Sequence, residues 1–244
     1  MVDPNLWTYL NGMSATIACI VGYIIGFIAL FRYLKEKRTA LSYVSYIGFF
    51  MGTVYLDITL SFITVLVFHE NLISPLISGW ITFTPSIGLT AVLSRLATKT
   101  FLIRIEKLAL ILIIILVPLF LFLLYWIPLN FGDLNIVFGG GEDPNSFLIK
   151  PQAGIAFGTI LTFFLILNIY VFSGGFYKLS RKLEGQERTR CLLLTWAFLI
   201  FSIGSIIEIT IPAEFLFTNI ILFPTRILLV ICYFLFYQGF LYYK

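Results

Sequence analysis

Long apolar stretches separated by short polar segments form the main pattern along the chain. A transmembrane helix needs about 20 apolar residues to cross about 30 Å of hydrocarbon. Seven stretches reach that length, and they predict helices over residues 8–31, 41–67, 79–98, 108–128, 153–176, 191–212 and 216–242. The pattern therefore predicts an all-α integral membrane protein, with residues 1–244 forming a single bundle of seven transmembrane helices.

The basic residues predict the orientation of this bundle. Of the 16 Lys and Arg residues, all but Lys150 and Arg226 lie at the end of, or after, the first, third, fifth or seventh apolar stretch. The positive-inside rule places these segments and the C-terminus in the cytoplasm and the N-terminus outside. The N-terminal sequence MVDPNLWTYLNG has no basic residue, which favours an uncleaved first helix over a signal peptide. We therefore expect a multi-pass protein of the plasma membrane.

Composition supports membrane insertion and excludes several functions. The chain is 60% hydrophobic and 11% charged, whereas soluble domains have about 25% charged residues. Its net charge of +4 follows from the basic loops, so we expect contact with membrane lipid and not with nucleic acid. The single histidine, His69, supplies too few ligands for a haem or a histidine-based metal site.

Motifs of known seven-helix proteins and of enzymes are missing at the positions where they are expected. The last stretch has no lysine before Lys244, although retinal attachment needs one there. The sequences SRLATKTF and FPTRILL stand where rhodopsin-like receptors carry Asp/Glu-Arg-Tyr and Asn-Pro-x-x-Tyr. No nucleophile–base pair stands out either. We expect no enzyme activity, no cofactor and no metal.

The longest segment between apolar stretches covers residues 129–152, LNFGDLNIVFGGGEDPNSFLIKPQ, on the predicted outside. An alternating apolar run precedes GGGEDPN, which is rich in turn-forming residues. The segment is either a lid-like β-hairpin or a disordered connector.

Small residues form a ridge along the first predicted helix, at four-residue spacing. They are Ser14, Ala18, Gly22 and Gly26. Such ridges let helix backbones approach closely in lipid. The ridge therefore predicts either packing within the chain or homodimerisation through this helix.

Polar stripes indicate which helices face the interior of the bundle. Residues at spacings of three, four or seven share one helix face. The stripes consist of Thr53, Asp57, Ser61 and Thr64; Thr82, Ser86, Thr90 and Ser94; Ser205 and Glu208; and Asn219, Arg226, Tyr233 and Tyr237. Helix 108–128 has no such stripe. We predict that the four striped helices line a polar interior and that helix 108–128 faces lipid.

Arg226 is the charge that most needs explanation, because it is predicted near the membrane midplane. An unpaired arginine there costs at least about 2.5–3.5 kcal/mol. Depth estimates favour Asp57 as its partner and Glu208 as the second choice, and Pro224 frees the carbonyl of Ile220 nearby. The candidate ligand or ion-pair site comprises Asp57, Arg226, Glu208, Asn219, Ser61 and Thr90. It is either a structural ion pair or a ligand or ion site that opens outward.

Three segments resemble the seven-helix sensor domains of prokaryotic histidine kinases and related signalling proteins. They are RYLKEKRTALSY, the long outside segment, and KLSRKLEGQERTRCLLLTWAFLIFSIGSIIEI. Such domains precede a kinase or another output module, whereas this chain ends at FLYYK. The resemblance therefore implies either a further output segment or a separate cytoplasmic partner.

The basic segment 177–190 is the candidate docking site for an acidic cytoplasmic effector. Its basic residues are Lys178, Arg181, Lys182, Arg188 and Arg190. Its alternative role is to fix topology and contact anionic lipid.

The sequence as a whole favours a receptor-like or sensory protein that passes an outside or intramembrane signal to a cytoplasmic partner. The expected mechanism is a shift of the last three helices, hinged near Pro224 and Pro212. One alternative is a small transporter or channel with a polar path through Asp57, Arg226 and Glu208. Against it, the halves show no inverted repeat and only the last helix is expected to be interrupted. Another alternative is a structural subunit of a membrane complex.

Overall fold

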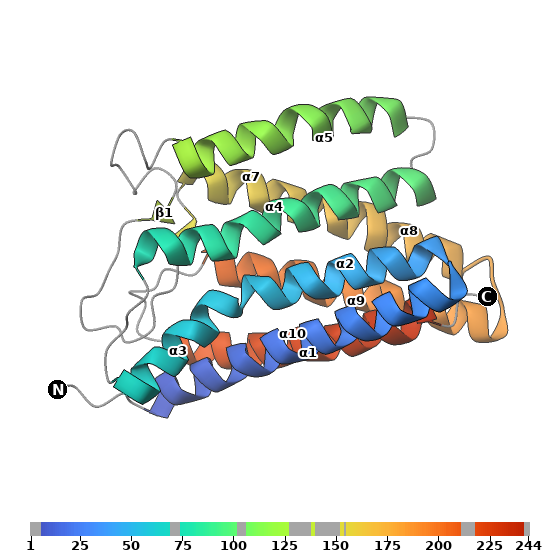
Figure 1. The fold of residues 1–244 in the computed structure, drawn as a ribbon. Coiled ribbons are helices and arrows are strands. Elements are labelled where there is room, and N and C mark those ends of the chain that lie inside the picture. The colour runs from blue at the N-terminus through green and yellow to red at the C-terminus, as the bar shows by residue number, and fades with distance from the viewer. Residues whose placement is uncertain are drawn as a thin grey trace.

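A computed structural model describes residues 6–68, 74–101, 106–126, 138–139, 152–153, 155–210 and 218–241. Long helices lie side by side and run back and forth along one direction (Figure 1). The helices in chain order are α1 (Leu6–Glu36), α2 (Thr39–Val54), α3 (Leu56–Phe68), α4 (Pro75–Thr100), α5 (Glu106–Leu121), α7 (Ile155–Asn168), α8 (Gly174–Ser180), α9 (Gly185–Thr210) and α10 (Thr218–Leu241). Two π-helical segments, η2 (Phe122–Trp126) and η3 (Ile169–Ser173), continue α5 and join α7 to α8.

Six helical segments among the described residues are long and apolar enough to cross a membrane. They cover Tyr9–Glu36, Thr39–Phe68, Ile77–Ala97, Leu161–Ser180, Gly185–Thr210 and Ile220–Phe240. The all-helical fold of a multi-pass membrane protein is thus confirmed. Helix α5, with 16 residues, is not among the six, so the seventh crossing and the orientation of the termini remain predictions.

The second predicted helix is interrupted, contrary to the sequence expectation. Helix α2 ends at Val54, Tyr55 has φ −94° and ψ 0°, and α3 starts at Leu56. The Tyr55 N–H bonds back to the Gly52 carbonyl at 3.2 Å, which is a tighter turn than that of an α-helix. The predicted helix 153–176 is also irregular, because it turns from α-helix to π-helix at η3. The expectation that only the last helix is interrupted was therefore wrong.

The small-residue ridge of α1 packs against α2 inside the chain. Ser14, Ala18, Gly22 and Gly26 are all buried. A Cβ atom added at Gly22 would lie 2.7 Å from the Gly52 Cα atom, so the two backbones touch where side chains are absent. The ridge is therefore used by intramolecular packing and offers no surface for a homodimer in this structure.

Helix α5 lies at an edge of the bundle, far from α1 (Figure 1). Together with η2 it packs against α4, where Phe120 and Leu124 are buried. Ile111, Ile114 and Ile115 are exposed. This agrees with the prediction that helix 108–128 faces lipid.

A short strand pair lies between α5 and α7. Strand β1 (Phe138–Gly139) pairs antiparallel with β2 (Gln152–Ala153), with Phe138 opposite Ala153. The pairing agrees with the β-hairpin alternative at these four residues, whereas the expected turn GGGEDPN lies outside the described residues.

One half of the bundle core is filled by aromatic rings, which we call the phenylalanine cluster: Phe172, Phe176, Phe198, Phe236 and Phe240. The Phe172 and Phe198 rings stack with centroids 4.3 Å apart, and the Phe236 ring meets Phe198 edge-on at 4.7 Å. These residues come from η3, α8, α9 and α10. The cluster lies toward the basic end of the bundle, where α8 ends and α9 begins, and it ties the last helices together there.

Candidate functional site

Arg226 forms an ion pair with Glu208, not with Asp57. Its Nε atom donates to Glu208 Oε1 at 2.8 Å, and its side chain is 2% exposed. Its Nη1 atom donates to the backbone carbonyl of Asn11 on α1 at 3.0 Å. The guanidinium carbon lies 5.8 Å from the centre of the Tyr55 ring, within the range of a cation–π contact. The first-choice partner was therefore wrong, and the second choice is the observed one.

Asp57 instead faces α4. Its carboxylate is fully buried in the first turn of α3, and Oδ2 accepts a hydrogen bond from the Ser78 hydroxyl at 2.8 Å. No ion pair to Asp57 occurs among the described residues. The interruption at Tyr55 separates α3 from α2, so Asp57 does not keep the direction that a continuous helix would give it. Glu208 lies on α9 and Arg226 lies on α10, and these two helices pack directly against each other.

The ion pair lies toward the end of the bundle where α9 ends and α10 begins. Arg226 follows the start of α10 by eight residues, about 12 Å at 1.5 Å per residue. Glu208 is two residues before the end of α9, and Asn11 is five residues after the start of α1. The guanidinium therefore reaches toward the ends of these helices, and its depth in the membrane stays a prediction.

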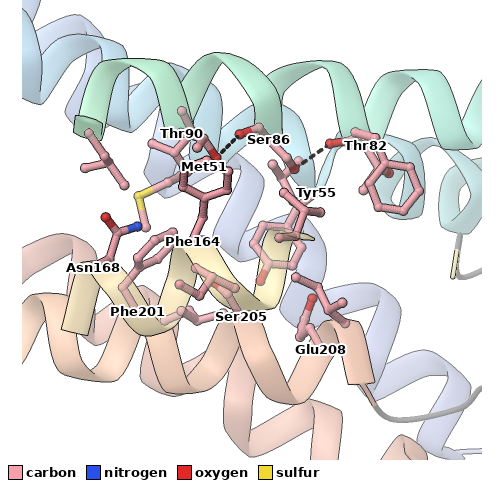
Figure 2. A pocket seen from close by; sticks show the side chains of 18 of the residues that line it. Met51, Tyr55, Thr82, Ser86, Thr90, Phe164, Asn168, Phe201, Ser205 and Glu208 are labelled. Carbon is pink, nitrogen blue, oxygen red and sulfur yellow. Dashed lines mark hydrogen bonds between the residues drawn. The ribbon is translucent and has the colours of Figure 1, made fainter. Parts of the chain in front are cut away.

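A partly open cavity of about 110 Å³ lies beside this ion pair, lined by residues of α2, α3, α4, α7, α9 and α10. Its apolar lining includes Met51, Phe83, Phe164, Phe201 and Leu229. Its polar lining consists of Tyr55, Thr82, Ser86, Thr90, Asn168, Ser205, Glu208 and Tyr233. Figure 2 shows Thr82, Ser86 and Thr90 along α4 on one side, with Asn168, Ser205 and Glu208 on the other.

The polar groups of the cavity differ in whether they are free to bind a ligand. The Ser86 and Thr90 hydroxyls donate to carbonyls one turn back, Thr82 O at 2.9 Å and Ser86 O at 2.8 Å (Figure 2). The Tyr233 hydroxyl is buried without a hydrogen-bond partner. Thr82 Oγ1 also lines the cavity and is likewise without a partner. Because buried hydroxyls are nearly always hydrogen-bonded, Tyr233 and Thr82 are the residues of the described lining that most need a partner from a ligand.

The predicted site residues fall into two neighbouring groups. Glu208 and Thr90 line the cavity, with Arg226 next to Glu208. Asp57 and Ser61 lie one turn apart on α3 and are fully buried, outside the cavity lining. The side chain of Asn219 lies outside the described residues.

Sequence reasoning missed Tyr55, Asn168 and the Asn11 carbonyl. Of these three, only Asn168 could have been found from the sequence, because an amide inside the apolar run FFLILNIYVF needs a partner inside the protein. Tyr55 and the Asn11 carbonyl gave no signal, since their roles depend on which helices are neighbours.

The basic segment lies at the opposite end from the ion pair. Lys178, Arg181, Lys182 and Arg188 are exposed, and Arg190 is half-buried. The Arg181 guanidinium lies 5.5 Å from the centre of the Tyr177 ring. The segment begins in the last turn of α8, which follows η3 directly, so it is continuous with the helix that carries Asn168 into the cavity lining.

No protein-family model, curated protein or solved structure matches this chain. The resemblance to sensor domains is thus carried by the sequence pattern alone. Any function must be argued from the geometry of the cavity, the ion pair and the basic segment.

Proposed function

We propose that this protein is a receptor-like seven-helix protein of the plasma membrane, with no enzyme activity. It binds a small, mainly apolar molecule inside the bundle and passes the signal to a cytoplasmic partner. The observation that carries the proposal is the cavity between α4 and the α7–α9–α10 group. A pocket with an apolar lining and a few converging polar groups is typical of a ligand site.

The cavity limits the size and chemistry of the ligand. An apolar protein cavity of about 150 Å³ can hold benzene, and common ligand pockets measure about 300–1,000 Å³. At about 110 Å³, this cavity fits a small molecule or one end of a lipid-like molecule. The Tyr233 hydroxyl and the Glu208–Arg226 pair supply contacts for one polar group of that ligand.

Signal transfer follows from the position of Asn168. It lines the cavity and immediately precedes η3, which contributes Phe172 to the phenylalanine cluster. π-Helical turns often occur at functional sites. A ligand that moves Asn168 changes the packing of η3 and, through α8, the position of the basic segment. The hinge at Pro224 lies inside α10, whereas Pro212 lies outside the described residues.

The basic segment is the proposed contact for an acidic cytoplasmic partner. Neutralising Lys178, Arg181 and Lys182 to Gln should abolish that contact without changing ligand binding, because these exposed side chains lie outside the cavity. Neutralising Arg32 and Lys35, also exposed in the last turns of α1, is the matched control.

Transport is the second candidate, because the α2–α3 interruption and η3 are the kind of irregular helices that line transport paths. Against it, the phenylalanine cluster fills the core toward the basic end among the described residues. Proteoliposomes separate the two functions. A channel or transporter should release trapped potassium or chloride faster than protein-free liposomes, whereas the receptor-like protein should not.

A photolabelling experiment tests the ligand site directly. Trifluoromethyl-phenyldiazirine is added to the protein in lipid nanodiscs, and the labelled residues are mapped by mass spectrometry. We expect labelling of the cavity-facing residues of α4 and α9 that saturates at low probe concentration. Ser205→Phe fills the cavity and should abolish it. Ile203→Phe adds the same ring at a side chain that is 45% exposed, so labelling should persist. Labelling confined to exposed residues would overturn the proposed ligand site.

A further inference from the structure

A second group of polar side chains lies next to the cavity, between α3 and α4. Asp57 and Ser61 are four residues apart on α3, and Ser78 and Thr82 are four residues apart on α4. Residues at this spacing lie on one helix face. The Ser78 hydroxyl donates to Asp57 Oδ2 at 2.8 Å, and Thr82 contributes a further side-chain hydrogen-bond interaction to the Asp57 carboxyl group. We call these four residues the Asp57 cluster.

Three oxygens of the Asp57 cluster make no hydrogen bond of standard geometry. They are Asp57 Oδ1, Ser61 Oγ and Thr82 Oγ1, each buried at the atomic level. Asp57, Ser61 and Ser78 are fully buried as whole residues. A buried polar atom without a partner costs about 1–3 kcal/mol, and more when it is charged. Such atoms on two helices that pack against each other, α3 and α4, therefore point to a bound species.

The charges around the cluster do not balance. Arg226 is the cation that acts on Asp57, but its Nε atom is bonded to Glu208. With Asp57 ionised, one positive and two negative charges would leave one net negative charge among these buried groups. A water molecule would supply hydrogen bonds but no charge, so it would not remove this imbalance.

We propose that the Asp57 cluster binds a monovalent alkali cation such as sodium. Carboxylate and hydroxyl oxygens are the ligands that hard cations prefer. One carboxylate with neutral hydroxyls balances a single positive charge, whereas divalent sites in proteins generally recruit more carboxylates. Asp57 neutralises the cation, Ser61 and Thr82 coordinate it with their free oxygens, and Ser78 positions the carboxylate while keeping its own lone pairs available.

This cation site does not depend on the proposed ligand site, although Thr82 belongs to both linings. A cation at the start of α3 would stabilise the interruption at Tyr55 and fix α3 against α4. The site can therefore be correct when the cavity binds no ligand, and the two proposals have separate tests.

Thermal unfolding of the purified protein tests the cation site. The three cysteines, Cys19, Cys191 and Cys232, are free and buried, so a thiol-reactive fluorogenic dye reports unfolding. Sodium chloride is exchanged for choline chloride at constant ionic strength. Because ligands that bind only the folded state stabilise it, the unfolding midpoint should rise with sodium and saturate. Sodium-22 binding to the folded protein should saturate over the same range.

Variants separate a specific site from a general salt effect. Asp57→Asn should abolish the sodium dependence, and Ser61→Ala should weaken sodium binding about tenfold or more. Ser202→Ala is the matched control, because the Ser202 hydroxyl is also buried and unpartnered but lies on α9, outside the cluster. If Asp57→Asn does not fold, the comparison of Ser61→Ala with Ser202→Ala decides the question.

Three results would overturn the cation site. The first is an unfolding midpoint that does not change between sodium and choline. The second is an equal loss of sodium binding in Ser61→Ala and Ser202→Ala. The third is an unfolding midpoint that rises at acidic pH without sodium in the native protein but not in Asp57→Asn. That result would show that a proton neutralises Asp57.

Discussion

Glu208→Gln should destabilise the bundle strongly, because it leaves Arg226 without its counter-charge. The Arg226 side chain is 2% exposed and its Nε atom contacts Glu208 Oε1 at 2.8 Å. Removing one partner of a buried ion pair typically costs about 3–5 kcal/mol. In the variant, Arg226 keeps its bond to the Asn11 carbonyl and its contact with the Tyr55 ring. We therefore expect the lower end of the range, about 3 kcal/mol.

Removing both charges should cost much less than removing Glu208 alone. Buried ion pairs are often replaceable by uncharged groups of similar volume at little cost. Arg226→Met combined with Glu208→Gln should therefore recover most of the lost stability, to within about 1–2 kcal/mol of the native protein. The coupling energy from this double-mutant cycle measures the direct interaction of the two side chains.

The assay is equilibrium unfolding in mixed micelles, with the denaturing detergent as the variable. A second cycle with Arg226→Met and Asp57→Asn is the internal comparison, because Asp57 interacts with Arg226 only at longer range. We expect a smaller coupling energy in this second cycle. A larger coupling between Arg226 and Asp57 than between Arg226 and Glu208 would refute the ion-pair assignment.

Three further predictions use the same unfolding assay. Gly22→Ala should cost about 1–3 kcal/mol, because the new Cβ atom would lie 2.7 Å from Gly52 Cα. Gly174→Ala is the control, because no atom lies within 4 Å of the new Cβ atom, and it should be neutral or stabilising by up to about 1 kcal/mol. Equal losses of stability at Gly22 and Gly174 would contradict the close packing of α1 on α2. Phe198→Ala should cost about 3–5 kcal/mol, because its fully buried ring joins three other rings of the phenylalanine cluster; a loss below about 1 kcal/mol would contradict that role. Lys37→Gly should stabilise by about 1 kcal/mol, since Lys37 has φ 54°; a destabilised variant would show that the Lys37 side chain contributes more than the backbone strain costs.

The helices were predictable because hydropathy and length determine them directly. Six of the seven predicted spans correspond to membrane-length helices among the described residues. The observed helix ends differ from the predicted ones where polar residues continue a helix past its apolar stretch. Helix α1, for example, extends to Glu36. The small-residue ridge also predicted close helix contact correctly, since the absence of side chains at Gly22 and Gly26 is itself the physical cause.

The interruptions were not predictable from hydropathy. The α2–α3 break occurs at Tyr55 within MGTVYLDITL, where no proline is present. The π-helical segment η3 begins at Ile169 inside an equally apolar run. Both depend on how neighbouring helices pack, and the order of apolar residues does not contain that information.

The predicted partner of Arg226 was wrong for the same reason. The sequence favoured Asp57 over Glu208, although the packing of the helices decides between them. Depth along a helix can be counted from the sequence at 1.5 Å per residue, and by that measure Asp57 matched Arg226. The rotation of each helix about its axis cannot be counted in this way. Glu208 belongs to α9, the sequence neighbour of α10 in an antiparallel pair, and short connections favour such neighbours. Weighting sequence neighbours above depth would have selected the observed partner.

The irregular parts of the helices coincide with the polar groups, and this coincidence has a physical cause. In hydrocarbon, backbone groups released from helical hydrogen bonds must find partners inside the protein. Tyr55 at the α2–α3 break and Asn168 before η3 both line the cavity, and Pro224 precedes Arg226 by two residues. Among the described residues, the cavity lining therefore combines irregular helix turns with unsatisfied polar atoms, those of Thr82 and Tyr233. The phenylalanine cluster is tightly packed by comparison. A ligand or cation that supplies the missing partners would act on the part of the bundle that is easiest to rearrange, and the packed rings would carry that rearrangement to the basic segment.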